Sequence, residues 1–189
     1  IGCEFVGHPL LENNIEEKID LNQVLGKNKA MISIFSGSRI SEINILMPIL
    51  LKFIELMNLK YNDFTYIFHS TKEQNLLVQS YIKSSDLKNC QVICDDKIKG
   101  YVLKKSIFAV TKSGTVSLEI CNAKIPSIVV YKMNFINFLI IKILVKIKFA
   151  NIINIAANEE IIPELLQAKC NPNNIYKVVS DLLDTPSKI

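Results

Sequence analysis

The sequence predicts an α/β fold, a doubly wound parallel sheet of the Rossmann type, and three observations support this prediction. Short apolar runs typical of buried strands alternate with longer amphipathic runs typical of helices, in about five successive units. The connections are short and carry no hairpin signal, so each strand is expected to reach the next through a helical crossover. The strand runs are almost continuously apolar, as in strands covered on both faces.

The expected elements follow one another along the whole chain. Apolar runs predict strands at residues 30–35, 64–68, 90–94, 107–110 and 126–131. Helical patterns occur at residues 21–26, 41–57, 72–82 and 98–104, and further helices are expected to start at 116, 161 and 171. Pro48 is expected to kink the long helix, and residues 150–156 are expected to form a loop or short turn. Without a repeat or a low-complexity linker, residues 1–189 are interpreted as one domain.

Polar side chains follow the ends of the successive predicted strands: Arg39, His69, Asp95, Ser113 and Tyr131. The carboxyl ends of parallel strands lie at one edge of a sheet, and ligands of such sheets bind beyond that edge. We therefore expect these residues to converge on one rim, where a nucleotide could bind.

Residues 112–119, with the sequence KSGTVSLE, join a buried strand to a helix. The unpaired N–H groups and the dipole at a helix start favour an anion such as a diphosphate. Gly114 would let the backbone approach that ligand, Ser113 and Thr115 would add hydroxyl groups, and Glu119 could bind the two hydroxyls of a ribose. An ordinary capped helix with a surface glutamate is the alternative.

Composition excludes some classes of function. The net charge of +4 suits an anionic ligand or an acidic membrane surface but is too weak to argue for nucleic acid, and the chain has no arginine-rich patch, aromatic stacking platform or nucleic-acid motif. The five cysteines are odd in number and follow no metal-site spacing, so we expect buried, reduced thiols, a reducing compartment and no metal site.

Residues 132–150 combine aliphatic and aromatic side chains with lysines. This segment is too interrupted for a transmembrane helix, but an amphipathic helix of this kind suits the surface of an anionic membrane or a channel for acyl chains. The residues expected to make that contact are Phe135, Phe138, Leu139, Lys142 and Lys146. The alternative is a core helix with lysines that extend to solvent.

Several stretches, in this order, resemble the C-terminal half of the bacterial lipid-A-disaccharide synthases, which are glycosyltransferases of the two-domain GT-B type. They are FVGHPL at 5–10, GSR at 37–39 with EI at 42–43, SGT at 113–115 with LE at 118–119, Pro126 with VVYK at 129–132, LVK at 144–146, Asn154, and IPELLQ at 162–167. The resemblance extends over nearly the whole chain and implies that the chain is the second Rossmann-like domain of such an enzyme.

The resemblance implies an inverting transfer of diacylglucosamine from UDP-2,3-diacylglucosamine to 2,3-diacylglucosamine 1-phosphate, which gives a β-1,6 disaccharide and UDP. It implies no metal or other cofactor, and it places the general base and the acceptor site in an N-terminal domain that this chain lacks, so the chain alone is expected to be inactive. Arg39 would stabilise the departing diphosphate. The full set of expected donor-binding residues is Gly37, Ser38, Arg39, Ser113, Gly114, Thr115, Glu119, Tyr131, Asn154, Glu164 and Gln167.

The implied location is the cytoplasmic face of the inner membrane of a Gram-negative bacterium, where the protein would attach peripherally. Whether it forms a homodimer is left open. For Asn154, Glu164 and Gln167, plain capping and surface roles are the alternative. Two other functions also stay open: another UDP-sugar enzyme of the same architecture, and a non-catalytic module that binds lipid surfaces.

Overall fold

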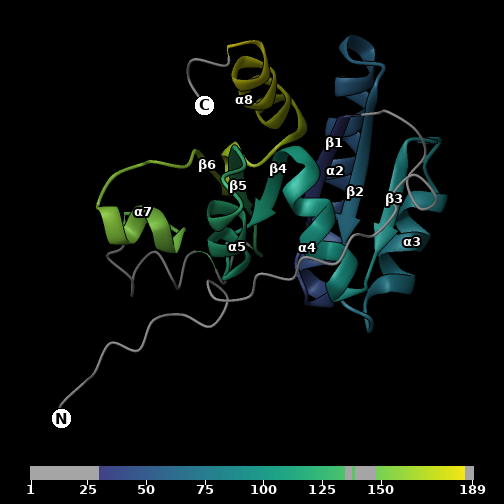
Figure 1. The fold of residues 1–189 in the computed structure, drawn as a ribbon, viewed down its shortest axis with the longest axis horizontal. Coiled ribbons are helices and arrows are strands. Elements are labelled where there is room, and N and C mark those ends of the chain that lie inside the picture. Colours follow the sequence, from purple (N-terminus) through teal and green to yellow (C-terminus); the bar gives the residue numbers. More distant parts are fainter. Residues whose placement is uncertain (1–29, 135–137, 139–147, 186–189) are drawn as a thin grey trace.

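The computed structural model describes residues 30–134, 138 and 148–185, and these form a six-stranded parallel sheet (Figure 1). The strands are β1 (Ala30–Phe35), β2 (Phe64–His69), β3 (Cys90–Ile93), β4 (Ser106–Lys112), β5 (Ser127–Tyr131) and β6 (Glu164–Leu166). Their spatial order is β3-β2-β1-β4-β5-β6, so the chain first moves outward from β1 in one direction and then returns to continue from β4 in the other. This order confirms the predicted doubly wound sheet.

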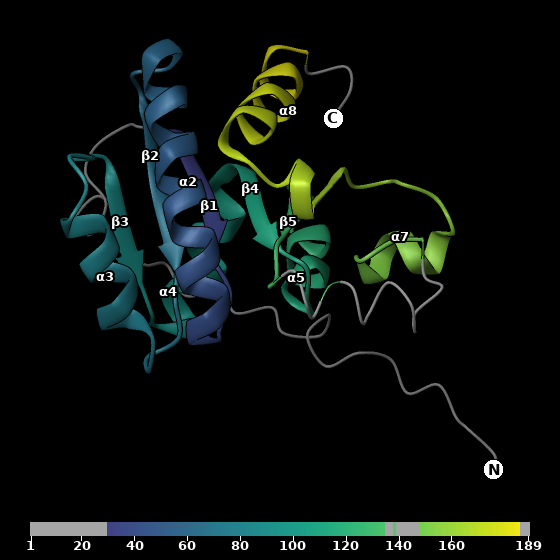
Figure 2. The same ribbon diagram turned by 180° about the vertical axis from the view of Figure 1, so that it is seen from behind.

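Helices cover both faces of the sheet, as Figures 1 and 2 show from opposite sides. One layer contains α2 (Ile40–Lys60), α3 (Asn75–Lys83) and α8 (Pro172–Asp184), whose apolar residues share the main core with β1, β2, β4 and β5. The other layer contains α4 (Asp96–Lys105) and α5 (Val116–Asn122), which form smaller apolar clusters on the opposite face. The helix α7 (Ile152–Ala157) lies beside α5, beyond β5.

The long helix α2 anchors the architecture because it buries one face against the sheet and also packs on α8. Its inward residues include Ile43, Met47, Leu50 and Ile54, which are fully buried and follow the spacing of an amphipathic helix. Pro48 lies within α2 without ending it, and its side chain is exposed. The N-terminus of α2 therefore has a fixed position directly after the carboxyl end of β1.

Two expected elements near the C-terminus are wrong. Residues 161–167 were expected to start a helix, but Glu164–Leu166 form β6, followed by the 3₁₀ turn η2 (Gln167–Lys169). Pro163 and Glu164 suit a helix start, but pairing with Val129–Tyr131 of β5 outweighs that local preference. Residues expected to form a loop instead form α7, whose start is capped by the side chain of Asn151, which accepts a hydrogen bond from the N–H of Ile153 at 2.8 Å.

Some expectations fall outside the described residues: the helix at 21–26, and Phe135, Leu139, Lys142 and Lys146 of the apolar basic segment. Phe138 is half-buried. Within the described parts of the chain, no helix is both long and apolar enough to cross a bilayer.

The cysteine prediction holds only in part. Cys90, Cys94, Cys121 and Cys170 are free thiols, but only Cys170 is buried and Cys121 is exposed. The sequence did not distinguish these positions because Cys121 lies in a helical pattern whose inward face became clear only with the fold.

Candidate functional site

A cleft of about 140 Å³ opens where the strand order reverses, at the carboxyl ends of β1 and β4. Gly37 and Ser38 line it from the loop after β1, and residues 112–115 line it from the turn after β4. His69 adds to its lining from the end of β2. The two stretches that the sequence singled out, 37–39 and 113–115, thus lie close together, as predicted.

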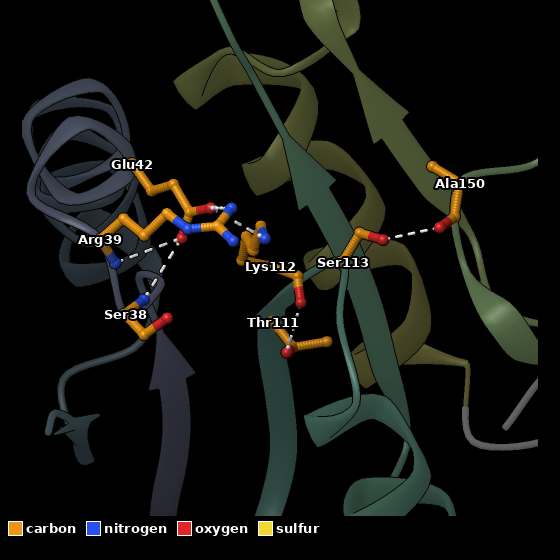
Figure 3. Close-up of polar contacts among 7 residues, drawn as sticks. All are labelled: Ser38, Arg39, Glu42, Thr111, Lys112, Ser113 and Ala150. Atoms are coloured by element: carbon orange, nitrogen blue, oxygen red, sulfur yellow. Dashed lines mark hydrogen bonds and ion pairs between the residues drawn. The ribbon is translucent and has the colours of Figure 1, made fainter. Parts of the chain in front are cut away.

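The carboxylate of Glu42 connects the two sides of this cleft (Figure 3). Its Oε2 accepts hydrogen bonds from the backbone N–H groups of Ser38 at 3.3 Å and Arg39 at 3.4 Å. Its Oε1 forms ion pairs with Lys112 Nζ at 3.0 Å and with the Arg39 guanidinium at 3.4 Å. One carboxylate therefore pairs with two cations, Lys112, which lines the cleft, and Arg39, which lies outside the described lining. Its hydrogen bonds to the N–H groups of Ser38 and Arg39 also fix the start of α2.

Sequence reasoning did not assign Lys112 or Glu42 to the site. A usable signal existed for Glu42, because a glutamate at the third helical position commonly reaches back to the residue before the helix. No local signal pairs it with Lys112, which is 70 positions away and enters only because β1 and β4 are neighbours. Lys112 has a side chain only 21% exposed, whereas that of Arg39 is 78% exposed.

Charges in the cleft influence one another. Burial alone raises the pKa of Glu42, but Lys112 and the N–H groups of Arg39 and Ser38 outweigh it and hold the pKa below its ordinary value. Tyr131, at the end of β5, lies under Lys112 with Nζ 5.4 Å from the ring centre. Burial and the charge of Glu42 raise the pKa of Tyr131, so its hydroxyl stays protonated. Arg39 and Lys112 together carry two positive charges, and the carboxylate of Glu42 between them carries one negative charge.

Gly37 is required by this arrangement. Its φ is +104°, and a Cβ at this position would lie 2.6 Å from Glu42 Oε2 and 2.9 Å from Glu42 Cβ. We expect Gly37→Ala to lower the free energy of unfolding by about 1–3 kcal/mol and to displace the Glu42 carboxylate. Urea unfolding would measure this, with Gly100→Ala as the control: a Cβ there meets nothing within 4 Å, and alanine should stabilise α4 slightly.

The turn after β4 differs in detail from its expected role. The hydroxyl of Ser113 donates to the carbonyl of Ala150 at 2.6 Å, so it ties the turn to the segment before α7 (Figure 3). Thr115 is exposed and its side chain does not cap α5. A Cβ on Gly114 would meet no atom of the described residues within 4 Å, so this part of the chain leaves the space beside Gly114 open. Binding of an anion by this turn stays a prediction.

Two other expected residues, Asn154 and Glu164, belong to a separate buried network. The Asn154 side chain donates to Ile162 O at 2.7 Å and Glu164 Oε1 at 2.8 Å, and it accepts from the N–H groups of Ile161 and Ile162 at 2.9 Å. Glu164 also accepts from the N–H groups of Ala150 and Asn151. Asn154 is fully buried and Glu164 is 9% exposed, which corrects the simple interpretation of both as caps and surface residues.

This network ties α7 and the segment before it to β6. The four hydrogen bonds of Asn154 use the full capacity of its amide. The Gln167 side-chain amide faces the backbone N–H and C=O of Met133, each at 3.3 Å in the orientation that satisfies both. Neither Asn154, Glu164 nor Gln167 belongs to the described lining of the cleft. Contact of these three residues with a ligand therefore stays a prediction.

Glu119 lies in the first turn of α5 and is half-buried. It belongs to the same strand-turn-helix unit as Ser113–Thr115 but does not line the described cleft. Its expected contact with a ribose also stays a prediction. Asp95, the polar residue after β3, likewise lies outside the described lining.

His69 was expected only as one polar residue of the rim, and the structure gives it a more specific setting. It is 4% exposed, lines the cleft, and has its Nε2 2.8 Å from the hydroxyl of Ser33. Burial, helped by the charge of Lys99, lowers the pKa of His69 to about 3. The imidazole is therefore neutral in the folded protein at any physiological pH.

The neutral His69 should make stability depend on pH. The unfolded chain takes up a proton at this residue below about pH 6.5, whereas the folded chain does not until about pH 3, so stability falls as the pH is lowered through this window. We expect a slope of about 1.4 kcal/mol per pH unit below pH 6. Urea unfolding at pH 7.0, 6.0 and 5.0 would measure the slope, and His69→Asn should remove most of it. An unchanged slope in this variant would contradict the assignment.

Comparison with known proteins gives consistent results. A family model described as lipid-A-disaccharide synthetase matches residues 1–188. The chain is 32% identical to the lipid-A-disaccharide synthase of Rickettsia prowazekii, with 100% of this chain and 50% of that protein covered. It is 35% identical to that of Sulfurihydrogenibium sp., with coverage of 95% and 49%. The chain thus spans about half the length of these curated relatives.

Solved structures with the same fold are more distant in sequence. UDP-GlcNAc 2-epimerase from Neisseria meningitidis bound to UDP-GlcNAc has a TM-score of 0.62 at 17% identity, over 89% of this chain and 40% of that one. Escherichia coli ADP-heptose lps heptosyltransferase II has a TM-score of 0.62 at 8% identity, over 88% of this chain and 50% of that one. At these identities the likeness supports the fold.

Proposed function

The chain belongs to the lipid-A-disaccharide synthetase family, and we propose that it is the domain of such a glycosyltransferase that binds the donor, UDP-2,3-diacylglucosamine. The whole reaction transfers diacylglucosamine to 2,3-diacylglucosamine 1-phosphate with inversion and releases UDP. The base that activates the acceptor hydroxyl would come from a second domain. On this proposal residues 1–189 form one donor-binding domain.

One observation carries the proposal. Gly37 and Ser38 after β1 and residues 112–115 after β4 line the same cleft at the switch point of the sheet. The cation Lys112 lies in that lining, and Arg39, outside the lining, pairs with Glu42, which belongs to it. A diphosphate carries negative charge that such cations and helix-start N–H groups stabilise. The Neisseria meningitidis protein of the same fold was solved with UDP-GlcNAc bound, which supports a UDP-sugar as the ligand class.

Different residues would contact different parts of the donor. Charge develops on the UDP leaving group as the glycosidic bond breaks, and Arg39 and Lys112 are placed to stabilise it. Glu42 would hold both cations in position before the donor binds. The bound diphosphate would then form ion pairs with the same cations. Glu119 would take the ribose hydroxyls, while Tyr131 would border the donor sugar beside Lys112.

A donor panel tests the assignment directly. Isothermal titration of the chain with UDP, UDP-GlcNAc and UDP-2,3-diacylglucosamine should show UDP binding and a higher affinity for the acylated donor than for UDP-GlcNAc. Equal affinity for the two sugars would favour another UDP-sugar enzyme of the same architecture. Absence of any UDP binding would contradict the proposal.

Peripheral attachment to the cytoplasmic face of the inner membrane is part of the proposal because the substrates carry acyl chains. Ile152 and Ile155 of α7 and Ile161 after it are 50%, 43% and 59% exposed. They follow the apolar basic segment in the sequence. These side chains offer an apolar surface for acyl groups or for the bilayer interface.

Liposome pelleting distinguishes membrane contact from donor binding. We expect Ile152→Ser/Ile155→Ser to weaken pelleting with anionic vesicles several-fold and to leave UDP binding unchanged. Arg39→Ala should weaken UDP binding and leave pelleting with the vesicles unchanged. If the wild-type chain binds no UDP while the isoleucine variant loses pelleting, the chain would fit the alternative of a lipid-surface module. Full UDP affinity in Arg39→Ala would instead exclude Arg39 from donor binding.

A further inference from the structure

The imidazole of His69 lies in a closely defined position at the border of the cleft. It is the last residue of β2, and its ring stacks on Phe35, the last residue of β1, with ring centres 4.2 Å apart and planes 15° from parallel. Both residues line the cleft. Packing on Phe35 therefore fixes the plane of the His69 ring.

A chain of hydrogen bonds determines which ring nitrogen carries the proton. The hydroxyl of Ser106 donates to the carbonyl of Val102 at 3.0 Å, so its one proton is used there. The 2.7 Å contact between the Ser33 and Ser106 hydroxyls must then use the proton of Ser33. The 2.8 Å contact between His69 Nε2 and Ser33 Oγ consequently needs a proton on Nε2.

A neutral imidazole with Nε2 protonated has a bare lone pair on Nδ1. This Nδ1 is buried and has no hydrogen-bond partner among the described residues. A buried acceptor without a donor is uncommon, because it loses its hydration and gains nothing in return. Since Nε2 is paired with Ser33, Nδ1 is the polar atom left without a partner among the described residues, on a ring that lines the cleft.

We propose that His69 is a specificity residue for the nucleotide: its unprotonated Nδ1 accepts a hydrogen bond from an N–H or O–H group of the bound UDP moiety. The inference rests on the proposed function. Phosphate oxygens cannot fill this role because they are acceptors, and the cations that suit them lie at Lys112 and Arg39. The donor group is the imide N–H of the uracil or a hydroxyl of the ribose.

Two substitutions separate the two edges of the imidazole. His69→Asn places an amide oxygen near the position of Nδ1 and loses the contact with Ser33. His69→Gln places an amide nitrogen near the position of Nε2, keeps the contact with Ser33 and loses the acceptor. Both variants lose the stacking on Phe35, so each is the matched control of the other, and thermal unfolding would show that both are folded.

Isothermal titration with UDP gives the main result. We expect His69→Gln to weaken UDP binding about tenfold and His69→Asn to weaken it no more than about threefold. Equal losses in the two variants, or no loss in His69→Gln, would overturn the inference while leaving UDP binding by the chain intact. If the wild-type chain itself does not bind UDP, both the proposed function and this inference are wrong.

Nucleotide analogues identify the donor group. N3-methyl-UDP lacks the imide N–H, and 2′-deoxy-UDP and 3′-deoxy-UDP each lack one ribose hydroxyl. One of these changes should weaken binding to the wild-type chain about tenfold and have little effect on His69→Gln. If none shows this coupling, the inference is wrong. Should either variant fail to fold, the ¹⁵N resonance of Nδ1 in the wild-type chain replaces this test. It should move upfield on UDP binding as the lone pair accepts a hydrogen bond, and the lack of such a shift would overturn the inference.

Discussion

Replacing Lys112 by alanine is expected to weaken UDP binding by about 10- to 100-fold. Lys112 lines the cleft, is mostly buried, and forms a 3.0 Å ion pair with Glu42. Its removal takes away a cation that the diphosphate would contact and leaves the Glu42 carboxylate, only 13% exposed, with less compensation. Isothermal titration with UDP measures the loss.

Lys52→Ala is the matched control for this prediction. Lys52 is an exposed lysine of α2 whose ion pair with Glu55 lies within the helix, outside the described cleft. Lys52→Ala should leave UDP affinity unchanged because Lys52 does not line the described cleft. The variant should also stay folded, because an exposed ion pair of this kind contributes little to stability. An equal loss in both variants would show that overall charge and not the position of Lys112 governs binding.

The Asn154→Ala variant should lose about 2–4 kcal/mol of unfolding free energy. Asn154 is fully buried, and its removal leaves the N–H groups of Ile161 and Ile162, the carbonyl of Ile162 and one oxygen of Glu164 without this partner. These groups hold α7 against the start of β6. Urea unfolding followed by circular dichroism measures the change.

Asn122→Ala serves as the control, since Asn122 is exposed at the end of α5 and should change stability by less than about 0.5 kcal/mol. UDP titration of Asn154→Ala, at a temperature where it is folded, separates structure from binding. Unchanged UDP affinity would limit Asn154 to the network, whereas a loss would support its predicted contact with the donor. A stability loss no larger than that of Asn122→Ala would contradict the network's importance.

The strands β1 to β5 were predictable from sequence because each contains a short, largely apolar run of strand length, and helical patterns separate these runs. The strand β6 was missed because three residues carry no periodic signal, and Pro163-Glu164 is a common helix start. In the fold, β6 pairs with β5, and its Glu164 accepts hydrogen bonds from the backbone N–H groups of Ala150 and Asn151. Such an interaction between distant residues has no local signature.

The candidate site was predictable in position more than in detail. Gly37–Arg39 and Ser113–Thr115 could be placed on one rim because parallel strands end at one edge. Sequence could not predict the ion pair of Glu42 with Lys112 or the unpartnered Nδ1 of His69. Each depends on which strands are neighbours in the sheet. The hydroxyl of Ser113 has a structural partner, the carbonyl of Ala150, that no local pattern indicates.

Titration of the ¹⁵N-labelled chain with UDP, followed by amide chemical shifts, tests the central claim most directly. We expect the largest changes at Gly37, Ser38, Gly114 and Thr115, on both sides of the cleft, and these changes should saturate together. Shifts confined to one side, or centred on α8 and α3, would contradict the account.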